Sequence, residues 1–257
     1  MRYTEKIHFF IFPAAFALMF CCGRPAGVRA EQALKVGVER SCPPFSYTDE
    51  AGGFSGFNID MARALCVAME RRCEFFALPP DGLLAELRED RLDLVMDVPA
   101  TSDYAEYMDF SAPYFHARFV YVGRIPPDRT EESGPARIGV CAGSDARRYL
   151  EETDALPRNT VVAGEAENIF AALRRGELDA MLVNILQAYA FLVSGADGQF
   201  EMIGDPLPLG ALSTSHRIGT RKNDRDLGAA VDRALREIRY NGIFLRINRA
   251  WFPHTLY

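Results

Sequence analysis

Short β-rich runs alternate with helical segments along most of this chain, and that alternation limits the folds open to it. Leu34 to Val38 is a β-rich run, and Asn58 to Glu70 follows with apolar residues at helical spacing. The order then continues as strand, helix and strand, over Cys73 to Leu78, Asp81 to Glu89 and Leu92 to Met96. Strands that alternate with helices of about ten residues predict βαβ units and a parallel sheet.

The same pattern starts again after the polar stretch from Pro126 to Pro135. The expected segments are a strand at Arg137 to Cys141, a helix at Ser144 to Glu152, a strand at Thr160 to Val162, a helix at Glu167 to Arg175, and a strand at Leu178 to Val183. Helices at Asp226 to Arg239 and up to Trp251 close the chain. This repetition predicts two α/β lobes.

The loops that follow the strands are the expected ligand-binding region. In open α/β sheets, ligands bind outside the carboxyl ends of the strands, where helix N-termini offer unpaired N–H groups. The loops concerned are 39–47, 96–104, 141–146 and 183–187. With two lobes, the loops of both would face each other across a cleft.

The N-terminus resembles an export signal. Arg2 and Lys6 precede an apolar run from Phe9 to Cys22, which is shorter than the span of about 20 residues that crosses a membrane. Val28-Arg29-Ala30 then offers a small-x-small cleavage site, so we expect cleavage after Ala30 and a periplasmic protein. An N-terminal membrane anchor or a lipid site at Cys21 or Cys22 is the less favoured alternative.

Charge argues against nucleic acid as a partner. The formal net charge is −6, and no run of Lys or Arg is longer than two residues, so a phosphate backbone has no obvious place to dock. The first 30 residues carry four basic residues and one acidic residue, and their removal makes the remaining chain more acidic.

Cysteine use is compatible with an oxidising compartment. Four cysteines remain after residue 30, and they allow three pairings: Cys42, Cys66, Cys73 and Cys141. Cys66 and Cys73 lie seven residues apart, around a helix end and the start of a strand, which brings them within reach of one another. No histidine lies close in sequence to these cysteines and no CxxC is present, so we expect neither a metal nor a cofactor.

Ordered motifs across residues 33 to 253 resemble the family 3 bacterial extracellular solute-binding proteins, the periplasmic receptors of polar amino-acid ABC transporters. In the first lobe they are Leu34 to Val38, Pro44 to Ser46, Gly56 to Asp60, Asp109 to Tyr114 and the ending Trp251-Phe252. In the second lobe they are Gly139 to Ser144 and Gly176 to Ala180. Each motif is weak alone, and the ordered set is specific.

The resemblance implies a type II periplasmic-binding fold of two α/β lobes with a hinge and an inter-lobe cleft. It implies a signal peptide at 1–30, lobe 1 at 31–122 and 216–257, and lobe 2 at 123–215, inserted between two crossover strands. It supports a Cys66–Cys73 disulfide, because the lysine/arginine/ornithine and histidine receptors are similar in carrying cysteines at the matching pair. It also implies a monomer that binds a small solute and docks on an inner-membrane permease.

The ligand residues depart from the family pattern. Family members bind the α-carboxylate of the solute with an arginine a few residues after the third strand, but this chain has no Arg or Lys from residue 92 to 117, and Tyr104 stands at the matching position. Asn184 replaces the acid that holds the α-ammonium, and Cys42 and Pro80 stand where aromatic residues are frequent. The loop from Met96 to Thr101 resembles instead the Met-Gly-Val-Pro-Ala loop of solute-binding-like proteins encoded with quinoprotein alcohol dehydrogenases.

Acidic residues in the expected cleft favour a cationic or hydroxyl-rich solute over an α-amino acid bound in the usual mode. Without the arginine, a solute carboxylate would be buried unpaired. The candidate ligand-binding residues are Glu39, Phe45, Asp97, Thr101, Tyr104, Ser144, Asp145 and Asn184. Several have structural alternatives: Phe45 as support for the Pro-Pro loop, Tyr104 as a helix-face residue, Ser144 as an N-cap, and Asp145 as a partner of the helix dipole. No motif surrounds His116 or His216, so we expect structural or exposed roles for them.

Two other functions compete with solute transport. A cyclohexadienyl dehydratase shares the family, and a cleft carboxylate can act as a general acid, but that enzyme resembles the receptors in keeping the carboxylate-binding arginine. An enzyme is therefore not expected. An accessory or sensory periplasmic protein, for example one associated with a dehydrogenase, is the stronger alternative, and the loop from Met96 to Thr101 supports it.

Overall fold

The computed structural model describes residues 33–99, 102–124, 137–142, 144–152, 161–194, 198–208 and 215–252. All of these residues belong to one compact unit of the chain. The expected signal peptide therefore lies outside the described residues. Within the described part, none of the helices has the length and apolar character that crossing a membrane requires.

The first sheet contains six strands in the order β4-β1-β5-β13-β6, with β7 also paired to β13. Their bounds are β1 Leu34–Glu39, β4 Cys73–Leu78, β5 Leu94–Pro99, β6 Met108–Phe110, β7 Phe115–His116 and β13 Ser215–Arg221. Strand β1 runs parallel to β4 and β5, whereas β13 runs antiparallel to β5, β6 and β7. A small hairpin pairs β2, Tyr47–Thr48, with β3, Phe54–Ser55.

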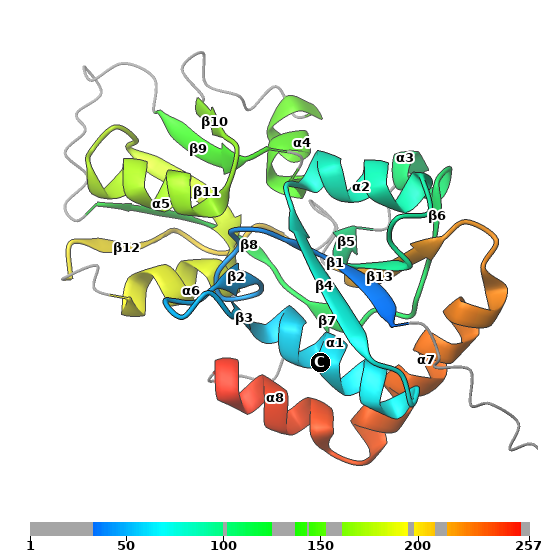
Figure 1. Ribbon diagram of the computed structural model, residues 1–257. Coiled ribbons are helices and arrows are strands. Elements are labelled where there is room, and N and C mark those ends of the chain that lie inside the picture. Colours follow the sequence, from blue (N-terminus) through cyan, green and yellow to red (C-terminus); the bar gives the residue numbers. More distant parts are fainter. Residues whose placement is uncertain are drawn as a thin grey trace, which may run out of the picture. The chain divides into compact units, whose positions relative to one another are not determined.

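Helices cover both faces of this sheet (Figure 1). Helices α1 (Phe57–Ala68), α7 (Arg225–Tyr240) and α8 (Ile243–Trp251) pack on one face, and α2 (Pro80–Arg88) packs on the other; the short α3 is Ser102–Ala105. The pleat of β5 explains the two cores, because successive side chains of a strand point to opposite faces. Leu94 and Met96 join the core under α1, whereas Val95 joins the core under α2.

The second sheet contains five strands in the order β10-β9-β11-β8-β12. Their bounds are β8 Phe119–Arg124, β9 Ile138–Cys141, β10 Val161–Ala163, β11 Ala180–Asn184 and β12 Phe200–Ile203. The helices α5 (Ala166–Arg174) and α6 (Ile185–Val193) cover one core, and α4 (Asp145–Glu152) covers the other. Met181 and Val183 face the first of these cores, and Leu182 faces the second.

The expected parallel pairs are present in both sheets, but each sheet also contains antiparallel strands that the sequence pattern did not predict. Strand β13 returns to the first sheet antiparallel to β5, and β8 enters the second sheet antiparallel to β11. Both strands connect the two sheets along the chain and therefore do not follow a βαβ crossover. The chain changes sheets between His116 and Phe119, a few residues before the predicted lobe boundary at residue 122, and the exact lobe boundaries stay predictions.

A disulfide joins Cys66, near the end of α1, to Cys73 at the start of β4, with a Cα–Cα distance of 6.0 Å. This is the pairing that the family resemblance implied. Cys42 and Cys141 are free thiols, the first buried and the second partly buried. The closed loop is short, so the link holds the end of α1 against the neighbouring strand rather than joining distant parts of the chain.

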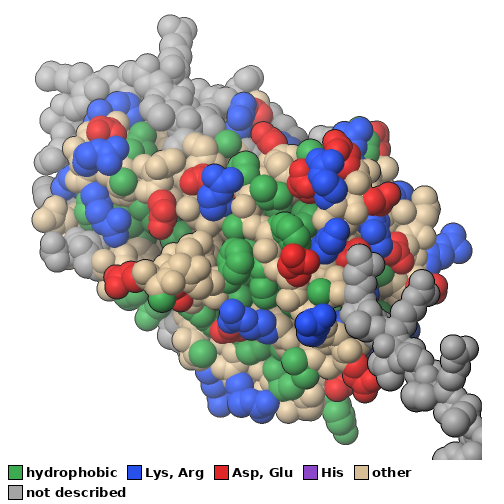
Figure 2. All heavy atoms as spheres, in the orientation of Figure 1, with side chains coloured by type: hydrophobic (Ala, Val, Ile, Leu, Met, Phe, Trp, Pro, Cys, Tyr) green, Lys and Arg blue, Asp and Glu red, His purple; other side chains and the backbone are tan. Residues whose placement is uncertain are grey.

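Charge is mixed rather than segregated on one face of the molecule (Figure 2). On the face shown in Figure 2, acidic and basic side chains lie interspersed around a more apolar centre. Among the described side chains visible there, no extended basic patch occurs.

Candidate functional site

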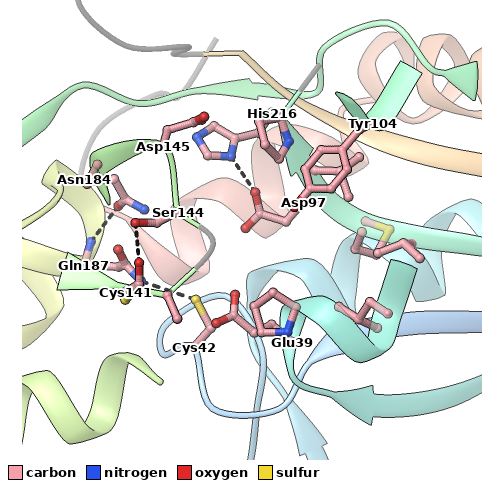
Figure 3. Close-up of a pocket in the computed structure, with 18 of the residues that line it drawn as sticks. Glu39, Cys42, Asp97, Tyr104, Cys141, Ser144, Asp145, Asn184, Gln187 and His216 are labelled. Atoms are coloured by element: carbon pink, nitrogen blue, oxygen red, sulfur yellow. Dashed lines mark hydrogen bonds and ion pairs between the residues drawn. The ribbon is translucent and has the colours of Figure 1, made fainter. Parts of the chain in front are cut away.

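One cavity of about 130 Å³ lies where the strands of both sheets end. Strands β1 and β5 of the first sheet and β9 and β11 of the second deliver residues to it. The side chains that the following argument uses are Glu39, Cys42, Asp97, Tyr104, Cys141, Ser144, Asp145, Asn184, Gln187 and His216 (Figure 3). The strand ends and the loops that follow them therefore line the cavity, in the region where the α/β pattern led us to expect a ligand site.

Three carboxylates line this cavity, and they come from both sheets. Glu39 ends β1, Asp97 lies in β5, and Asp145 begins α4. Among the described residues that line the cavity, none is an arginine or a lysine. The cavity is therefore a region of concentrated negative charge with few permanent positive charges to balance it.

Glu39 holds a proton unusually tightly. Burial, followed by the nearby charge of Asp97, raises the pKa of its carboxyl from 4.5 to about 7, and a hydrogen bond from Cys42 opposes the rise only in part. Burial disfavours the ionised form of Glu39, so a positive charge placed beside this carboxyl would stabilise its ionised form.

Asp145 is buried, with only 6% of its surface exposed. It forms an ion pair with Arg148 one turn further along α4. Burial raises the pKa of the Asp145 carboxyl, while Arg148 and His216 lower it and Asp97 raises it further. Asp145 lines the cavity, whereas Arg148 does not. The ion pair therefore joins Asp145 to a side chain outside the cavity lining.

Asp97 is held in place by an unusual backbone and by two hydrogen bonds. Its φ angle is +63°, in the left-handed region that residues other than Gly, Asn and Asp rarely adopt. Its Oδ2 accepts a hydrogen bond of 3.1 Å from Asn58 Nδ2, and its Oδ1 lies 2.5 Å from His216 Nδ1. The Tyr114 hydroxyl donates to Asn58 Oδ1 at 2.6 Å, so a buried network orients this carboxylate.

His216 is a site residue that the sequence analysis missed. It lies on β13, lines the cavity and is 8% exposed, and its ring stacks on Phe115 with a centroid distance of 4.1 Å and an interplanar angle of 6°. The available signal was the alternation along 215–221, which places His216 on the same face as the buried Ile218 and Thr220. His216 is therefore not exposed, and the structure places it at the cavity, whereas the expectation of a structural role stays a prediction.

Helix caps from the second sheet form the opposite wall. The Oδ1 atom of Asn184 accepts from the backbone N–H groups of Leu186 and Gln187, at 3.1 and 2.9 Å, and so caps α6. Ser144 Oγ accepts from the N–H of Arg147 at 3.2 Å and donates to the Cys141 carbonyl at 2.7 Å. Both residues line the cavity, so the capping and ligand roles are compatible at each position.

The two free thiols also line the cavity. Gln187 Nε2 donates to Cys42 Sγ at 3.3 Å, which links α6 of the second sheet to the loop after β1. Burial raises the pKa of the Cys141 thiol to about 12, and it raises the pKa of the Cys42 thiol well above its usual value. Neither cysteine therefore supplies a thiolate nucleophile at neutral pH.

The remaining candidates divide into three cases. Tyr104 lines the cavity, as expected. Phe45 does not, because its ring is fully buried in the first core between Phe57, Phe115 and Phe252, so the structure does not bring it to the ligand. Thr101 lies outside the described residues. In the part of the chain that the structure describes, no group of three or more His, Cys, Asp or Glu side chains is arranged to hold a metal ion.

Comparison with known families decides the assignment. Residues 34–254 match the sequence model of the bacterial extracellular solute-binding proteins, family 3. The chain belongs to this family. Family 3 members among its relatives include the lysine/arginine/ornithine-binding periplasmic protein of Escherichia coli, which is 27% identical over 233 residues, covering 88% of this chain and 90% of the relative. The L-arginine-binding protein of Pseudomonas aeruginosa is 26% identical over 236 residues, covering 89% and 91%.

Solved structures agree with the family 3 assignment. An ancestral arginine-binding protein bound to arginine has a TM-score of 0.75 and 26% identity, covering 87% of this chain and 99% of that chain. A histidine kinase sensor domain similar to periplasmic binding proteins has a TM-score of 0.76 at 18% identity, covering 87% and 97%, and this likeness shows the fold alone. The chain therefore has the type II periplasmic-binding fold, and its family is one of periplasmic solute-binding components of ABC transporters.

Proposed function

We propose that this chain is a periplasmic receptor that binds a small organic cation without an α-carboxylate and delivers it to an ABC transporter. One observation carries the proposal: three carboxylates from two sheets line a cavity to which the described residues contribute no arginine or lysine. An amine or guanidinium group satisfies these acidic side chains, whereas a solute carboxylate would lie beside them with no arginine or lysine among the described lining residues.

The names of the relatives support a basic solute. Several relatives are named for binding arginine, lysine or histidine, which carry both a basic side chain and an α-carboxylate. Acidic residues suit the basic end of such a solute. Tyr104 stands where the resemblance implies the carboxylate-binding arginine, and a tyrosine hydroxyl does not neutralise a carboxylate. The proposed solute thus keeps the basic group and lacks the carboxylate.

Hinge closure is the proposed mode of capture. The cavity is lined from both sheets, and two strands, β8 and β13, begin just after the chain passes from one sheet to the other. Two lobes that close on a solute present a different surface to a permease from the one they present when open. The lobe boundaries at residues 122 and 215 and the partnership with a permease belong to this proposal.

A matched set of solutes tests the missing-carboxylate argument directly. Agmatine is compared with arginine, cadaverine with lysine, and ethanolamine with serine, since each pair differs only by the carboxylate. The protein is partly unfolded and refolded to remove carried-over solute, and thermal unfolding is then recorded with each compound. Solute at 100 times its dissociation constant stabilises by about 2.7 kcal/mol, which raises the unfolding midpoint by roughly 5 °C or more.

We expect at least one of the decarboxylated amines to raise the midpoint and its parent amino acid to have little effect. A larger shift with arginine, lysine or serine than with the matching amine would show that the site binds α-amino acids in spite of Tyr104 and Asn184.

A matched pair of variants separates the cavity charge from helix electrostatics. Asp145→Asn removes a carboxylate in the first turn of α4, at the cavity, and Asp226→Asn removes one in the first turn of α7, away from it. Both substitutions weaken the interaction with a helix dipole by a similar amount. Only Asp145→Asn is expected to weaken binding of the amine, by about tenfold or more, because a charge-assisted hydrogen bond is worth roughly 1.5–3 kcal/mol.

An accessory periplasmic role is the second candidate. The loop from Met96 to Thr101, which resembles that of dehydrogenase-associated proteins, favours it, as does Tyr104 at the arginine position. In that case none of the amines or amino acids stabilises the protein, whereas a co-purifying partner does. The solute screen therefore distinguishes the two functions without any knowledge of the partner.

A further inference from the structure

A ring nitrogen beside the cavity has no hydrogen-bond partner. Nε2 of His216 is buried, and no described residue donates to it or accepts from it. His216 is more than nine-tenths buried and lines the cavity. A buried polar atom left unpaired costs about 1–3 kcal/mol, so native structures seldom keep one without a use for it.

The surrounding network fixes which nitrogen of the ring carries a proton. The Tyr114 hydroxyl donates to Asn58 Oδ1, and Asn58 Nδ2 donates to Asp97 Oδ2. The other oxygen of Asp97 lies 2.5 Å from His216 Nδ1. An ionised carboxylate only accepts hydrogen bonds, so Nδ1 is the donor in this contact. In the neutral ring the remaining nitrogen, Nε2, then has a free lone pair and is an acceptor.

The ring is also held in a fixed orientation. Phe115 stacks on one face of it, and Asp97 holds one edge. Figure 3 shows the imidazole lying between the carboxyl groups of Asp97 and Asp145. The titratable groups around it are therefore Asp97 on β5, Asp145 on α4 and His116 on β7. A solute group that enters between the two carboxylates lies beside Nε2.

We propose that Nε2 of His216 accepts a hydrogen bond from an N–H group at the charged end of the bound solute, with Asp97 as the residue that positions the ring. The inference rests on the proposed function and narrows it, because the cation must carry a hydrogen-bond donor at its charged end. Primary amines, secondary amines and guanidinium groups satisfy this requirement. Quaternary ammonium groups do not, since every N–H is replaced by carbon.

The first experiment needs no solute. Protein labelled with ¹⁵N at histidine is examined by two-bond ¹H–¹⁵N correlation spectra near neutral pH, with His216→Gln used to assign the ring. We expect Nδ1 of His216 to be protonated and Nε2 to be bare, and we expect Asp97→Asn, a residue also tolerated at positive φ, to change that tautomer. A proton on Nε2 in the wild-type protein would overturn the inference, whatever solutes the protein binds.

The second experiment uses cadaverine and pentamethonium, which is cadaverine with trimethylated ends. His216→Asn keeps a donor for Asp97 but places no atom at Nε2, whereas His216→Gln keeps an acceptor near Nε2. In calorimetric titrations we expect cadaverine to bind the wild-type protein at least about tenfold more tightly than pentamethonium does. We expect His216→Asn to abolish that preference and His216→Gln to retain most of it.

Each result is informative. Equal losses of cadaverine affinity in the Asn and Gln variants would overturn the acceptor role, because the ring would then matter only for packing on Phe115. Tight binding of pentamethonium would overturn it as well. If wild-type protein binds no amine at all, the proposed function fails, and the tautomer of His216 in the solute-free protein alone decides whether Nε2 is an available acceptor.

Discussion

At the scale of single residues, the candidate site depends on how strongly burial changes acid–base behaviour. Glu39, Asp97 and Asp145 have the same charge in the sequence, yet their surroundings differ. Glu39 has a raised pKa, Asp97 is hydrogen-bonded by two side chains, and Asp145 is paired with Arg148. The group with the least compensation, Glu39, therefore has the clearest consequence for stability.

We expect the free energy of unfolding to decrease as pH rises from about 4.5 to 7, with Glu39 contributing to the decrease. In that range the native state keeps the Glu39 proton while the unfolded state releases it, so raising the pH favours unfolding. The shift corresponds to up to about 3 kcal/mol. Urea unfolding at pH 5 and pH 8 should show a smaller change in Glu39→Gln, whereas the same substitution at the exposed Glu74 should leave the change intact.

Sequence reasoning found the carboxylates and missed the histidine for a physical reason. Glu39 ends β1, and Asp97 directly follows the β-rich run Leu92 to Met96, so the rule for strand ends places both near the site. His216 lies on β13, which comes back to the first sheet from almost a hundred residues further along the chain. Its neighbours are set by antiparallel pairing with β5 and β7, so the alternation along β13 indicates its buried face but not the distant residues that it meets.

Phe45 illustrates the opposite error. A family resemblance suggested an aromatic surface for the solute, but the ring fills the first core together with Phe57 and Phe115. From the sequence alone, an aromatic residue after a proline pair is equally compatible with packing in the core and with binding a solute. Only the contacts of the folded chain separate the two roles.

At the scale of elements, the starts of helices α6 and α1 position residues of the candidate site. The sequence predicted most helices and strands of the βαβ segments to within a few residues, because their apolar periodicity is local. The strands β6, β7, β8, β12 and β13 were not predicted individually, since they are short or defined by antiparallel pairing. Helix α6, which Asn184 caps, was also not predicted.

Substitutions at Asn184 are expected to separate its two roles. Asn184→Ala removes the acceptor for two backbone N–H groups and should lower the free energy of unfolding by about 1–2 kcal/mol. Asn184→Asp keeps an acceptor and adds a carboxylate to the cavity, so it should retain the cap and tighten binding of cadaverine. Chemical denaturation and calorimetry measure the two effects. Weaker cadaverine binding by the Asp variant would argue against a cation at this wall.

The start of α1 is expected to tolerate only glycine at residue 56. Gly56 has a φ of +128°, and an added Cβ would lie 2.2 Å from the Phe45 carbonyl oxygen. Gly56→Ala should therefore destabilise the protein by more than about 2 kcal/mol, and it should disturb Asn58, which supports Asp97. The control Gly52→Ala also has a positive φ but meets nothing within 4 Å, so it should cost only about 1 kcal/mol.

At the scale of the whole molecule, exposed surface charges and the cavity carboxylates are expected to respond differently to salt. The chain carries a net charge of −6, and acidic and basic side chains are interspersed on the face shown in Figure 2, whereas the cavity carboxylates are partly or largely buried. Exposed charges are screened within about 10 Å at 0.1 M salt, and buried ones much less. Attraction by the surface and attraction by the cavity thus predict different salt dependences.

We expect the affinity for cadaverine to change by less than about threefold between 50 and 500 mM sodium chloride, because the proposed contacts are shielded from solvent. Calorimetric titrations at several salt concentrations measure this. Lysozyme, a basic protein that meets only the outer surface, serves as the control for nonspecific attraction. A steep, parallel loss of cadaverine binding with salt would place the attraction at the surface rather than in the cavity.

The left-handed backbone at Asp97 also limits how this site can drift during evolution. Single-nucleotide changes in an aspartate codon lead to Asn, Gly, His, Tyr, Ala, Val or Glu, and a positive φ admits chiefly Asn, Gly and His from that set. The glycine in the Met-Gly-Val-Pro-Ala loop of the dehydrogenase-associated proteins is one of these neighbours. A single mutation can therefore remove the carboxylate at residue 97, whereas its replacement by the longer glutamate is disfavoured by the backbone.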